Sequence, residues 1–445
     1  MRNRYDSYKD SGLEWIGEIP THWSTDRLKW VSEIENSGVW GEDNEFPNSV
    51  NVPIPTTGQL SIDGEWYYDK MNLRNLSNDE WNKYKCIVGD IVVVKSSGSS
   101  TNIITGKCGF ISEEDSEKFG FSNFLMRVRP EKMIPKLVYY FLSSNLTKQR
   151  IERMVSSTTY PNLKVDEYSN SELLIPPLSE QQQIVSFLDT KTSLIDSLIE
   201  KTQRKIELLK EKRTSLINEL VTKGLNPIVE MKDSGVEWIG EIPSHWGRLP
   251  LKQFGDVTLG KMLTSEDKGG YHLKPYLRSK NIQVERVDIS DMKEMWFSDS
   301  EVEKLKLEKG DLLFNEGGDV GRTCIWLNEI DECYIQNSVN RVRFENDDER
   351  YFLHLSILYH SVGYYDSLVN RVSIPHLTKE KLESVTFLRP PLSEQQQIVE
   401  YLDEQTQLID NTISIEEKRI ELLKEYRQSL ISEVVTGKLK VTTDE

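Results

Sequence analysis

The chain carries two sequence segments twice, and this internal repeat constrains its fold more than any other feature. DSGLEWIGEIPTHW at residues 10–23 returns as DSGVEWIGEIPSHW at residues 233–246, with 12 of 14 positions identical. We call these two copies the tryptophan motifs. A longer segment, which we call the glutamine motif, spans residues 176–225 and opens with PPLSEQQQIV. It returns at residues 390–439 with 31 of 50 positions identical. Repeats with so long a period indicate duplicated domains.

The stretches between the repeated segments do not repeat. Ser24 to about Arg153 and Gly247 to about Asp366 have similar lengths but share almost no sequence. Each half of the chain is therefore a variable body between a constant beginning and a constant end. A length of 445 residues accommodates two bodies of roughly 150 residues and two long helices. We expect the first body at residues 1–175, a central helix at 176–225, the second body at 226–389 and a C-terminal helix at 390–445.

Both copies of the longer segment have the pattern of a coiled-coil helix. Apolar residues recur at alternating steps of three and four, which is a heptad seam, and a helix with one apolar stripe needs a partner. The connection permits parallel or antiparallel pairing, but two bodies at opposite ends of a rod of roughly 65 Å, related by an approximate twofold axis, require the antiparallel one. The expected pairing residues near the middle of the seams are Ile195, Ile199, Thr202, Ile206, Ile409, Ile413, Glu416 and Ile420.

Polar residues in the seams and at the helix ends add detail to this prediction. Thr202 and Glu416 either specify the pairing register or are ordinary solvated steps, and the sequence leaves both readings open. We expect Arg213 and Arg427 to extend their guanidinium groups to solvent. Ser179 and Ser393, which follow the Pro-Pro pairs, are plausible N-caps of the two helices.

Each variable body reads as a mixture of strands and helices in the same order. Strands are expected at residues 91–95, 107–111 and 124–129 of the first body, followed by a helix at 136–154. Strands are expected at 312–314, 323–326 and 339–344 of the second body, followed by a helix at 350–369. The sequence thus predicts an α+β fold: two bodies of mixed α/β structure separated by two long antiparallel coiled-coil helices, with an internal pseudo-twofold repeat.

Polar loops follow the strands at equivalent places in the two bodies. SSGSSTNIITGK at residues 96–107 corresponds to NEGGDVGR at 315–322, and STTYPNL at 157–163 corresponds to RVSIPHL at 371–377. Ser, Asn, Arg and Lys on loops of a rigid body suit hydrogen bonding to base edges, and the same residue types also form plain turns. Trp15, Trp23, Trp238 and Trp246 lie in the constant tryptophan motifs, so we expect them to pack against the scaffold instead of stacking on bases.

Composition restricts the partners and the compartment. The net charge of −17 argues against a protein that holds a duplex by bulk attraction, so an acidic DNA reader needs another subunit to supply phosphate contacts. The chain has no apolar stretch long enough to span a membrane, and its N-terminal residues lack the apolar core of a signal peptide, which predicts a cytoplasmic protein. The four cysteines show no metal-ligand spacing, so we expect reduced, structural thiols.

Catalytic motifs are not recognisable. The stretch from Gly98 to Lys107 faintly resembles a phosphate loop, but Cys108 stands where Ser or Thr would hold magnesium. The Pro-Pro pairs resemble an amino-methyltransferase motif, but Ile175 and Arg389 replace the Asn or Asp that this motif requires. We therefore expect a protein that is not an enzyme and that binds no cofactor or metal itself.

The tryptophan motifs, the PPLSEQQQIV helix starts and the GDLLFNEGGDVGR stretch together resemble the specificity subunit of Type I restriction-modification systems. The resemblance covers nearly the whole chain. It implies two target-recognition domains that each read half of a split site on double-stranded DNA, with the paired helices setting the spacing. It also implies two modification (methyltransferase) subunits as partners, which bind S-adenosylmethionine and methylate adenine. Restriction subunits would add ATP-driven translocation and cleavage, so ATP and magnesium are expected in the partners.

The resemblance points to the polar loops as the DNA-contacting regions. In the first body the candidates are Lys95, Ser96, Ser97, Asn102, Lys107, Tyr160 and Asn162. In the second body they are Asn315, Arg322, Asn337, Asn340, Arg341, Arg371 and His376. Because the two bodies differ so much, we expect an asymmetric, bipartite target. The alternative, which the net acidity favours, is a coiled-coil adaptor that joins two protein partners without DNA contact.

Overall fold

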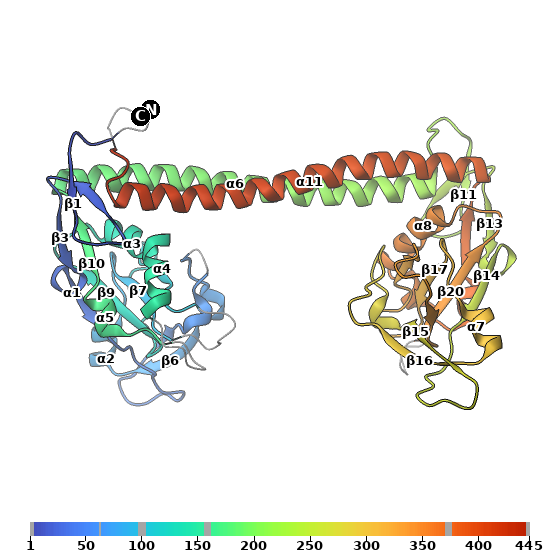
Figure 1. The fold of residues 1–445 in the computed structure, drawn as a ribbon, viewed down its shortest axis with the longest axis horizontal. Helices are drawn as coiled ribbons and strands as arrows, with labels where there is room; N and C mark the ends of the chain where they lie inside the picture. The colour runs from blue at the N-terminus through green and yellow to red at the C-terminus, as the bar shows by residue number, and fades with distance from the viewer. Residues whose placement is uncertain (1–3, 62–63, 97–103, 155–161, 370–375, 442–445) are drawn as a thin grey trace. The chain divides into compact units, whose positions relative to one another are not determined.

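A computed structural model describes residues 4–61, 64–96, 104–154, 162–369 and 376–441. Its internal contacts divide the chain into two compact units, residues 1–203 with 417–445 and residues 204–416. Each unit contains one variable body and parts of both long helices (Figure 1). In the described part of the chain, no helix is both long enough and apolar enough to cross a lipid bilayer.

The first body is built on a four-stranded antiparallel sheet. Its strand order is β4 (Ser32–Glu35), β9 (Leu125–Pro130), β7 (Ile91–Val94), β8 (Cys108–Phe110). Successive side chains of β7 point to opposite faces and enter two different clusters, Ile91 and Val93 in one and Val92 and Val94 in the other. Both faces of the sheet are therefore covered.

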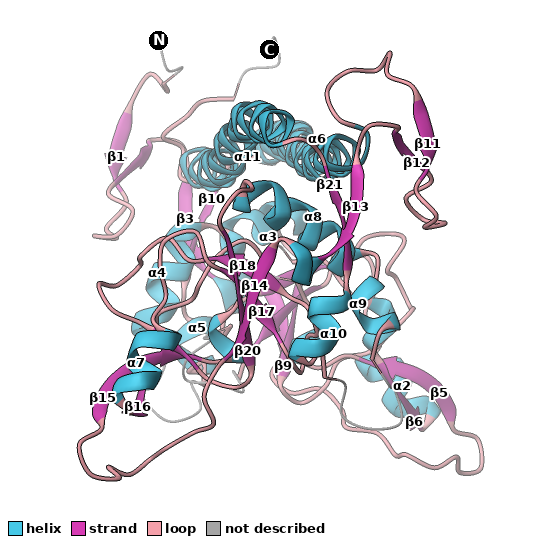
Figure 2. Ribbon diagram, turned by 90° about the vertical axis from the view of Figure 1, so that its right-hand side faces the viewer, coloured by secondary structure: helices cyan, strands magenta, loops and turns pink. Residues whose placement is uncertain are grey.

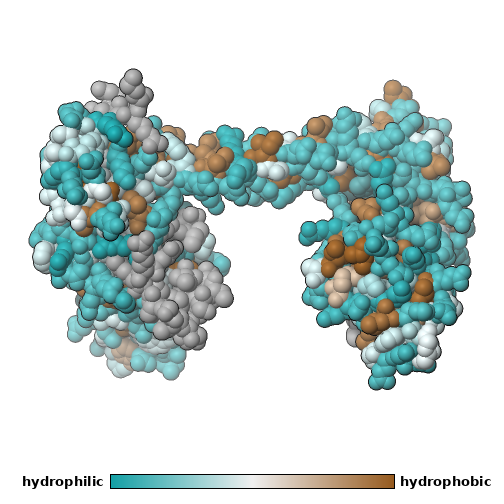
Figure 3. Space-filling view, viewed as in Figure 1, coloured by the Kyte–Doolittle hydropathy of each residue, from teal (hydrophilic) through white to brown (hydrophobic). Residues whose placement is uncertain are grey.

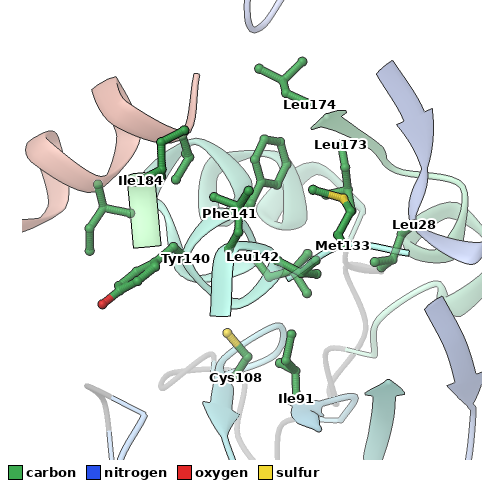
Figure 4. Close-up of a cluster of buried hydrophobic side chains, with 14 of the residues drawn as sticks. Leu28, Ile91, Cys108, Met133, Tyr140, Phe141, Leu142, Leu173, Leu174 and Ile184 are labelled. Carbon is green, nitrogen blue, oxygen red and sulfur yellow. The ribbon is translucent and has the colours of Figure 1, made fainter. Parts of the chain in front are cut away.

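Helix α3 (Pro135–Ser143) covers one of these faces. Figure 4 shows this helix, with Tyr140 and Leu142, lying over Ile91 and Cys108 of the sheet. The hydroxyl of Tyr140 also donates to Asp189 at 2.5 Å, which ties the body to the first long helix. The remaining helices and strands of the first body are β1 (Tyr8–Asp10), β2 (Glu18–Pro20), β3 (Ser24–Arg27), α1 (Leu28–Val31), β5 (Val50–Ile54), β6 (Asn72–Leu76), α2 (Asn78–Tyr84), α4 (Asn145–Met154), α5 (Val165–Ser169) and β10 (Glu172–Ile175), with 3-10 helices η1 (Thr57–Gln59) and η2 (Tyr68–Lys70).

The second body repeats this architecture with different residues. Its sheet has the order β14 (Gly255–Leu259), β20 (Val339–Phe344), β17 (Leu312–Asn315), β18 (Thr323–Ile325), and all neighbours are antiparallel (Figure 2). Leu312 and Phe314 enter one cluster and Leu313 another, as in the first body. The other elements are β11 (Met231–Asp233), β12 (Glu241–Pro243), β13 (Gly247–Pro250), η3 (Leu251–Gln253), β15 (His272–Leu277), η4 (Ser279–Asn281), β16 (Lys293–Phe297), α7 (Asp299–Leu305), β19 (Tyr334–Ile335), α8 (Glu349–Ser361), α9 (Tyr364–Ser367), α10 (Lys379–Ser384) and β21 (Thr386–Arg389).

The six strands predicted from the sequence are confirmed, but the helix after each sheet is interrupted. Instead of one helix at 136–154, α3 ends at Ser143 and α4 begins at Asn145, because Ser144 is extended and its hydroxyl donates to the Phe141 carbonyl at 2.7 Å. In the second body α8 ends at Ser361 and α9 begins at Tyr364, because Gly363 adopts a left-handed conformation with φ of 72°. The prediction of one continuous helix was wrong in both places.

The long helices are α6 (Leu178–Lys223) and α11 (Leu392–Val435). Ser179 and Ser393 lie inside the first turns and are not the caps, because each helix starts directly after its Pro-Pro pair. The backbone N–H of Gln181 donates to the Pro177 carbonyl at 3.0 Å, and the second helix repeats this contact between Gln395 and Pro391. A proline tolerates this place because the first residues of a helix have no intrahelical acceptor for an N–H.

The two long helices contact each other within each unit. In the first unit, Leu188 and Ile195 from the first half of α6 share a core with Leu430 and Val434 from the end of α11. In the second unit, the end of α6 shares a core with the start of α11. The predicted seam residues Ile195, Thr202, Ile206, Ile409, Ile413 and Glu416 are buried, and Ile199 and Ile420 are half-buried.

The sequence predicts that the two seam arginines extend to solvent, but in the structure both lie against carboxylates. Arg427 lies against Asp196 with a separation of 2.9 Å, and Arg213 lies against Asp410 at 3.2 Å. Arg213 also donates to both carboxylate oxygens of Glu285, at 3.1 Å each. The expectation was wrong because a helical sequence alone does not show which carboxylate the opposite helix brings near.

Candidate nucleic-acid interface

Each tryptophan motif packs against a glutamine motif. Trp23 is completely buried, and its indole N–H donates to Glu180 in the first turn of α6 at 2.5 Å. His22 contacts the same carboxylate at 2.9 Å, and His245 contacts Glu394 in the first turn of α11 at 2.8 Å. Strand β3, which follows the first motif, pairs with β10, which precedes the first Pro-Pro pair, and β13 pairs with β21 in the same way. These residues are scaffold, as their place in the constant segments predicts.

A buried ion pair anchors the strand that leads to each polar loop. The carboxylate of Asp90 is fully buried and accepts two hydrogen bonds from Arg129, at 2.7 and 2.8 Å. Asp311 accepts two from Arg343, at 2.7 Å each. These hydrogen bonds to a carboxylate raise the pKa of both arginines. The Gly-Asp pairs before β7 and β17 therefore fix the strands from which the loops emerge.

The loops that follow β7 and β17 are held by the same backbone hydrogen bonds. In the first body the N–H of Lys95 donates to the Phe124 carbonyl at 2.9 Å, and the N–H of Leu163 donates to the Lys95 carbonyl at 2.8 Å. A β-bridge then joins Ser96 to Asn162. Three loops that are distant in sequence are thus brought to one place.

In the second body Glu316 takes the position of Lys95. Its N–H donates to the Ser338 carbonyl at 3.0 Å, its carbonyl accepts from the N–H of Leu377 at 2.7 Å, and a β-bridge joins Gly317 to His376. Ser96 is therefore equivalent to Gly317, and Asn162 is equivalent to His376. The two bodies hold the same backbone framework although they share almost no sequence.

The side chains on this framework differ in charge and hydrogen bonding. Lys95 donates to the Asn36 carbonyl at 2.9 Å, and partial burial lowers its pKa. Glu316 is half-buried, and desolvation raises its pKa, partly opposed by the nearby His376. Asn162 and His376 are exposed. A cation and a hydroxyl in one body are thus replaced by an acid and a glycine in the other, so the two surfaces differ in charge and in the hydrogen bonds that they can make.

The basic residue at the end of each loop ties the loop to the body. Lys107 donates to the Leu60 carbonyl, and Arg322 donates to the Ser279 carbonyl at 3.1 Å. Both are half-buried and occupy equivalent positions, since the strand residues before the loops, Val94 and Asn315, donate their N–H groups to the carbonyls of Lys107 and Arg322. Both residues lie next to the loops, and their hydrogen bonds support the fold; their contact with DNA stays a prediction.

Three predicted contact residues are buried inside the second body. Arg341 is 4% exposed and donates to the carbonyls of Lys304 and Lys306, at 3.1 and 3.2 Å. Asn340 donates to the Leu377 carbonyl at 3.1 Å. Asn315 is fully buried, and the orientation of its amide that satisfies its hydrogen bonds turns the amide oxygen toward the guanidinium of Arg322. Side chains that are buried and bonded to the protein do not reach a base in this conformation.

The role of Arg341 is repeated in the first body, which supports a structural function. Arg127 is equally buried and donates to the carbonyls of Lys83 and Lys85 at 3.0 and 3.4 Å, which lie at the end of α2 as Lys304 and Lys306 lie at the end of α7. Of the other candidates, Asn337 is half-buried and its backbone N–H donates to the Lys261 carbonyl at 2.8 Å. Ser97, Asn102, Tyr160 and Arg371 lie outside the described residues.

Two exposed apolar residues beside these loops were not found from the sequence. Trp40 is 50% exposed and contacts Phe124, and Met262 is 74% exposed at the corresponding place in the second body. No motif or periodicity distinguishes either residue from other apolar residues, and their place is visible only in the folded body. Among the residues described, no group of three or more His, Cys, Asp or Glu side chains is arranged to hold a metal ion.

Comparison with known proteins identifies the family. The pattern of the Type I restriction modification DNA specificity domain matches residues 20–208 and again residues 243–425. The chain belongs to this family. Each match spans one body and most of the following long helix, so the specificity domain occurs twice in this chain, as the internal repeat indicates.

The chain is similar in sequence to specificity subunits of type I restriction enzymes. It is 25% identical over 445 residues to a putative type I restriction enzyme MjaX specificity subunit from Methanocaldococcus jannaschii, with 96% of each chain covered. It is 23% identical to the type I restriction enzyme EcoKI specificity subunit from Escherichia coli, with 79% of this chain and 75% of that chain covered.

Solved structures show the same fold. A chain from a structure of the type I R-M system that addresses complex assembly and conformational transition is 16% identical, with a TM-score of 0.69, and 95% of this chain and 99% of that chain are covered. The HsdS subunit from Thermoanaerobacter tengcongensis is 15% identical, with a TM-score of 0.55, and 95% and 98% are covered. Both likenesses confirm the mixed α/β fold.

Proposed function

We propose that this chain is the DNA-recognition subunit of a Type I restriction-modification complex and that its two bodies read the two unlike halves of a bipartite target. The observation that carries the proposal is the common backbone framework with unlike side chains. Lys95, Ser96 and Asn162 occupy in one body the places of Glu316, Gly317 and His376 in the other. A fixed geometry with exchanged polar groups is what the reading of different bases requires.

An asymmetric target follows from this difference between the bodies. Two identical readers related by a twofold axis would select a palindrome, whereas unlike readers select unlike half-sites. The test is methylation profiling of the host genome with and without this chain. We expect a motif of two different half-sites separated by bases of no fixed identity, and a single continuous palindrome would contradict the proposal.

We further propose that the long helices form an antiparallel coiled coil that fixes the spacing between the half-sites. Arg213 and Arg427 occupy equivalent positions in the two copies of the repeat, and so do Asp196 and Asp410. One ion pair joins Arg213 of α6 to Asp410 of α11, and the other joins Arg427 of α11 to Asp196 of α6, so the two helices exchange roles between the two contacts. Such an exchange is the property of a twofold-related contact. A helix of 46 residues, such as α6, has a length of about 70 Å at 1.5 Å per residue.

The long helices also offer a surface for the modification subunits. Tyr401, Leu408, Ile415 and Leu422 recur every seven residues along α11, and all are exposed. On α6 the exposed Leu194 and Leu208 have the equivalent spacing of two heptads. Figure 3 shows hydrophobic side chains on the surface of the two helices. This outer apolar stripe is separate from the seam, and we propose that helices of two modification subunits cover it.

The partners would also supply what this acidic chain lacks. With a net charge of −17, the chain gains little from attraction to phosphates, so the modification subunits would provide much of the backbone contact. We assign S-adenosylmethionine to the modification subunits, and ATP and magnesium to the restriction subunits, and propose that this chain itself is non-catalytic. A complex of this kind acts on chromosomal DNA, which places it in the cytoplasm.

Footprinting of the assembled complex distinguishes this function from a protein adaptor without DNA contact. The DNA-recognition subunit predicts protection of two separate stretches of the target. An adaptor predicts the same protection with and without this chain. Loss of both protected stretches when the chain is left out therefore supports the proposal.

A further inference from the structure

Trp40 forms a fixed aromatic platform at the rim of the first body. Its ring meets Phe124 edge-on, with the centroids 5.6 Å apart, and the guanidinium of Arg74 lies 5.7 Å from the ring centroid. Arg74 is itself held by an ion pair with Asp43. The ring is nevertheless half exposed to solvent. An indole held on two sides and open on another is pre-organised for contact, because little side-chain entropy remains to be lost.

The platform adjoins the loop framework described above. The carbonyl of Phe124, the residue that the Trp40 ring contacts, accepts hydrogen bonds from the N–H groups of Lys95 and Ser96, at 2.9 and 3.3 Å. Arg74 places a cation beside an exposed aromatic face in a chain that is acidic as a whole. An apolar face with a cation at its edge complements DNA, which presents thymine methyl groups between two rows of phosphates.

The second body places an apolar side chain at the same position. Gly38 and Gly260 both lie directly against a backbone carbonyl of a segment that precedes a sheet strand. The N–H of the residue after each glycine then donates to a backbone carbonyl at 3.0 Å, from Val39 to Phe121 in one body and from Lys261 to Ile335 in the other. Counting two residues on from each glycine leads to Trp40 and Met262, so these positions are equivalent. Met262 is 74% exposed.

This shared position calls for an explanation outside the folded body. A large apolar residue gains nothing from exposure to water, and the two bodies have otherwise diverged almost completely in sequence. Packing within the body does not account for it, because most of Met262 and half of Trp40 contact solvent. A surface that meets a common ligand does account for it, and in the proposed function that ligand is duplex DNA.

We propose that Trp40 and Met262 are specificity-determining residues, each of which places an apolar side chain against the base edges of its own half-site. This inference rests on the proposed function and adds to it a position that both bodies use. Trp40 offers a rigid, flat face, and Met262 offers a flexible, polarisable chain, so each body selects a different pattern of methyl groups and base edges.

The test uses the full chain assembled with its modification subunits and measures binding to the target identified by methylation profiling. Trp40→Ala is expected to weaken binding to the full target about tenfold, in the range found for a well-placed base contact. On DNA whose first half-site is scrambled the variant and the wild type are expected to bind equally. Met262→Ala is expected to show the reciprocal behaviour on DNA whose second half-site is scrambled.

Trp30 provides a matched control. It is 53% exposed, also lies near a guanidinium, with Arg27 5.2 Å from its ring centroid, and it belongs to α1, outside the loop framework. Trp30→Ala should bind DNA within twofold of the wild type. Trp40→Phe, which keeps an aromatic face of smaller size, is expected to lose about threefold, and it serves as the second variant should Trp40→Ala fail to fold.

The outcomes separate this inference from the function on which it rests. If Trp40→Ala and Trp40→Phe bind like the Trp30→Ala control while the wild-type complex still protects two half-sites, the inference is overturned and the proposed function stands. If this chain adds no protection to the complex at all, the proposed function itself fails. Thermal unfolding of each variant shows that a loss of binding is not a loss of folding.

Discussion

The guanidinium of Arg427 lies 2.9 Å from the carboxylate of Asp196 on the other long helix. Substitutions at this contact therefore test the pairing register of the two helices. The equivalent pair is Arg213 with Asp410. Both carboxylates are about half exposed, so each pair stabilises the chain only modestly, by about 0.5–1 kcal/mol.

Charge reversal of this pair is the first prediction. Arg427→Asp places two like charges together and should lower the free energy of unfolding by about 1 kcal/mol or more. The double variant Arg427→Asp with Asp196→Arg restores opposite charges and should recover most of that loss. Thermal unfolding at low salt measures both. Equal stability of the single and double variants would show that the pairing register is different.

The end of α11 gives a second prediction, at a glycine. Gly437 has a φ of 71°, and a Cβ added there would lie 2.5 Å from Cδ of Pro20 and 3.2 Å from the ring of Trp23. Gly437→Ala therefore combines backbone strain with a clash against a rigid ring, and should cost about 2–4 kcal/mol. Thermal or urea unfolding measures this loss.

Gly224 at the end of α6 is the matched comparison for this variant. Its φ is 72°, and an added Cβ would lie 2.9 Å from Oε1 of Glu394, the end of a side chain that can move, and 3.1 Å from the ring of Trp246, with no contact as close as that of Pro20 at Gly437. Gly224→Ala should therefore cost less, about 1–2 kcal/mol, mostly from backbone strain. A larger loss for Gly224→Ala than for Gly437→Ala would contradict the packing of α11 on the tryptophan motif.

Buried His354 gives the third prediction, a dependence of stability on pH. Burial lowers its pKa, and the nearby Arg213 and Arg350 act in the same direction, while Glu285 and Asp403 oppose them. The folded chain therefore keeps the imidazole neutral where the unfolded chain takes up a proton. Stability contributed by this residue is complete above its ordinary pKa of about 6.5, and it declines as the pH falls from there toward the lower folded value.

Unfolding at a series of pH values tests this sign. Between pH 7 and 5 the wild type should lose stability by up to about 1.4 kcal/mol per pH unit from this one proton, and His354→Gln should lose less. Parallel curves for His354→Gln and the wild type would exclude the buried imidazole as the cause.

Much of the scaffold could be predicted from the sequence because its signals are periodic. The three-four spacing of apolar residues identified the helix seam, and runs such as Ile91 to Val94 identified strands buried on both faces. The sequence could not show that Arg341 is internal, because an arginine can either contact a base or donate hydrogen bonds to backbone carbonyls inside the protein. Only the fold reveals that Arg127 makes the same internal contact in the first body.

Single residues of the candidate interface were less predictable for a related reason. The backbone framework that makes Lys95 equivalent to Glu316 consists of hydrogen bonds between loops that are distant in sequence, and side-chain letters carry no signal of it. Trp40 and Met262 were missed because an exposed apolar residue has no distinctive spacing. Sequence reasoning therefore selected loops that the fold brings together, but it could not rank the residues in them.

The outer stripe of α11 gives the fourth prediction. If modification subunits cover it, Leu408→Lys and Ile415→Asp should weaken assembly of the complex, because a charge would be buried in an apolar contact. Each should leave the unfolding of the isolated chain nearly unchanged, since both side chains are exposed in it. Sizing of the reconstituted complex measures assembly.

Ile228 is a suitable control for these variants. It is 90% exposed and lies beyond the end of α6, away from the stripe. Ile228→Asp should assemble like the wild type. Normal assembly of both stripe variants would mean that the modification subunits dock elsewhere.

The length of the paired helices gives the last prediction. One heptad inserted after Thr202 and another after Glu416 lengthen both helices near the middle of their seams by about 10 Å and keep the seams in phase. Since base pairs rise about 3.4 Å each, the spacer in the target should grow by about three base pairs. Seven flexible residues inserted at residues 225–230, outside both helices, should leave the spacer unchanged. Methylation profiling reads the spacer directly, and an unaltered spacer in the lengthened variant would show that the helices do not set the distance between the half-sites.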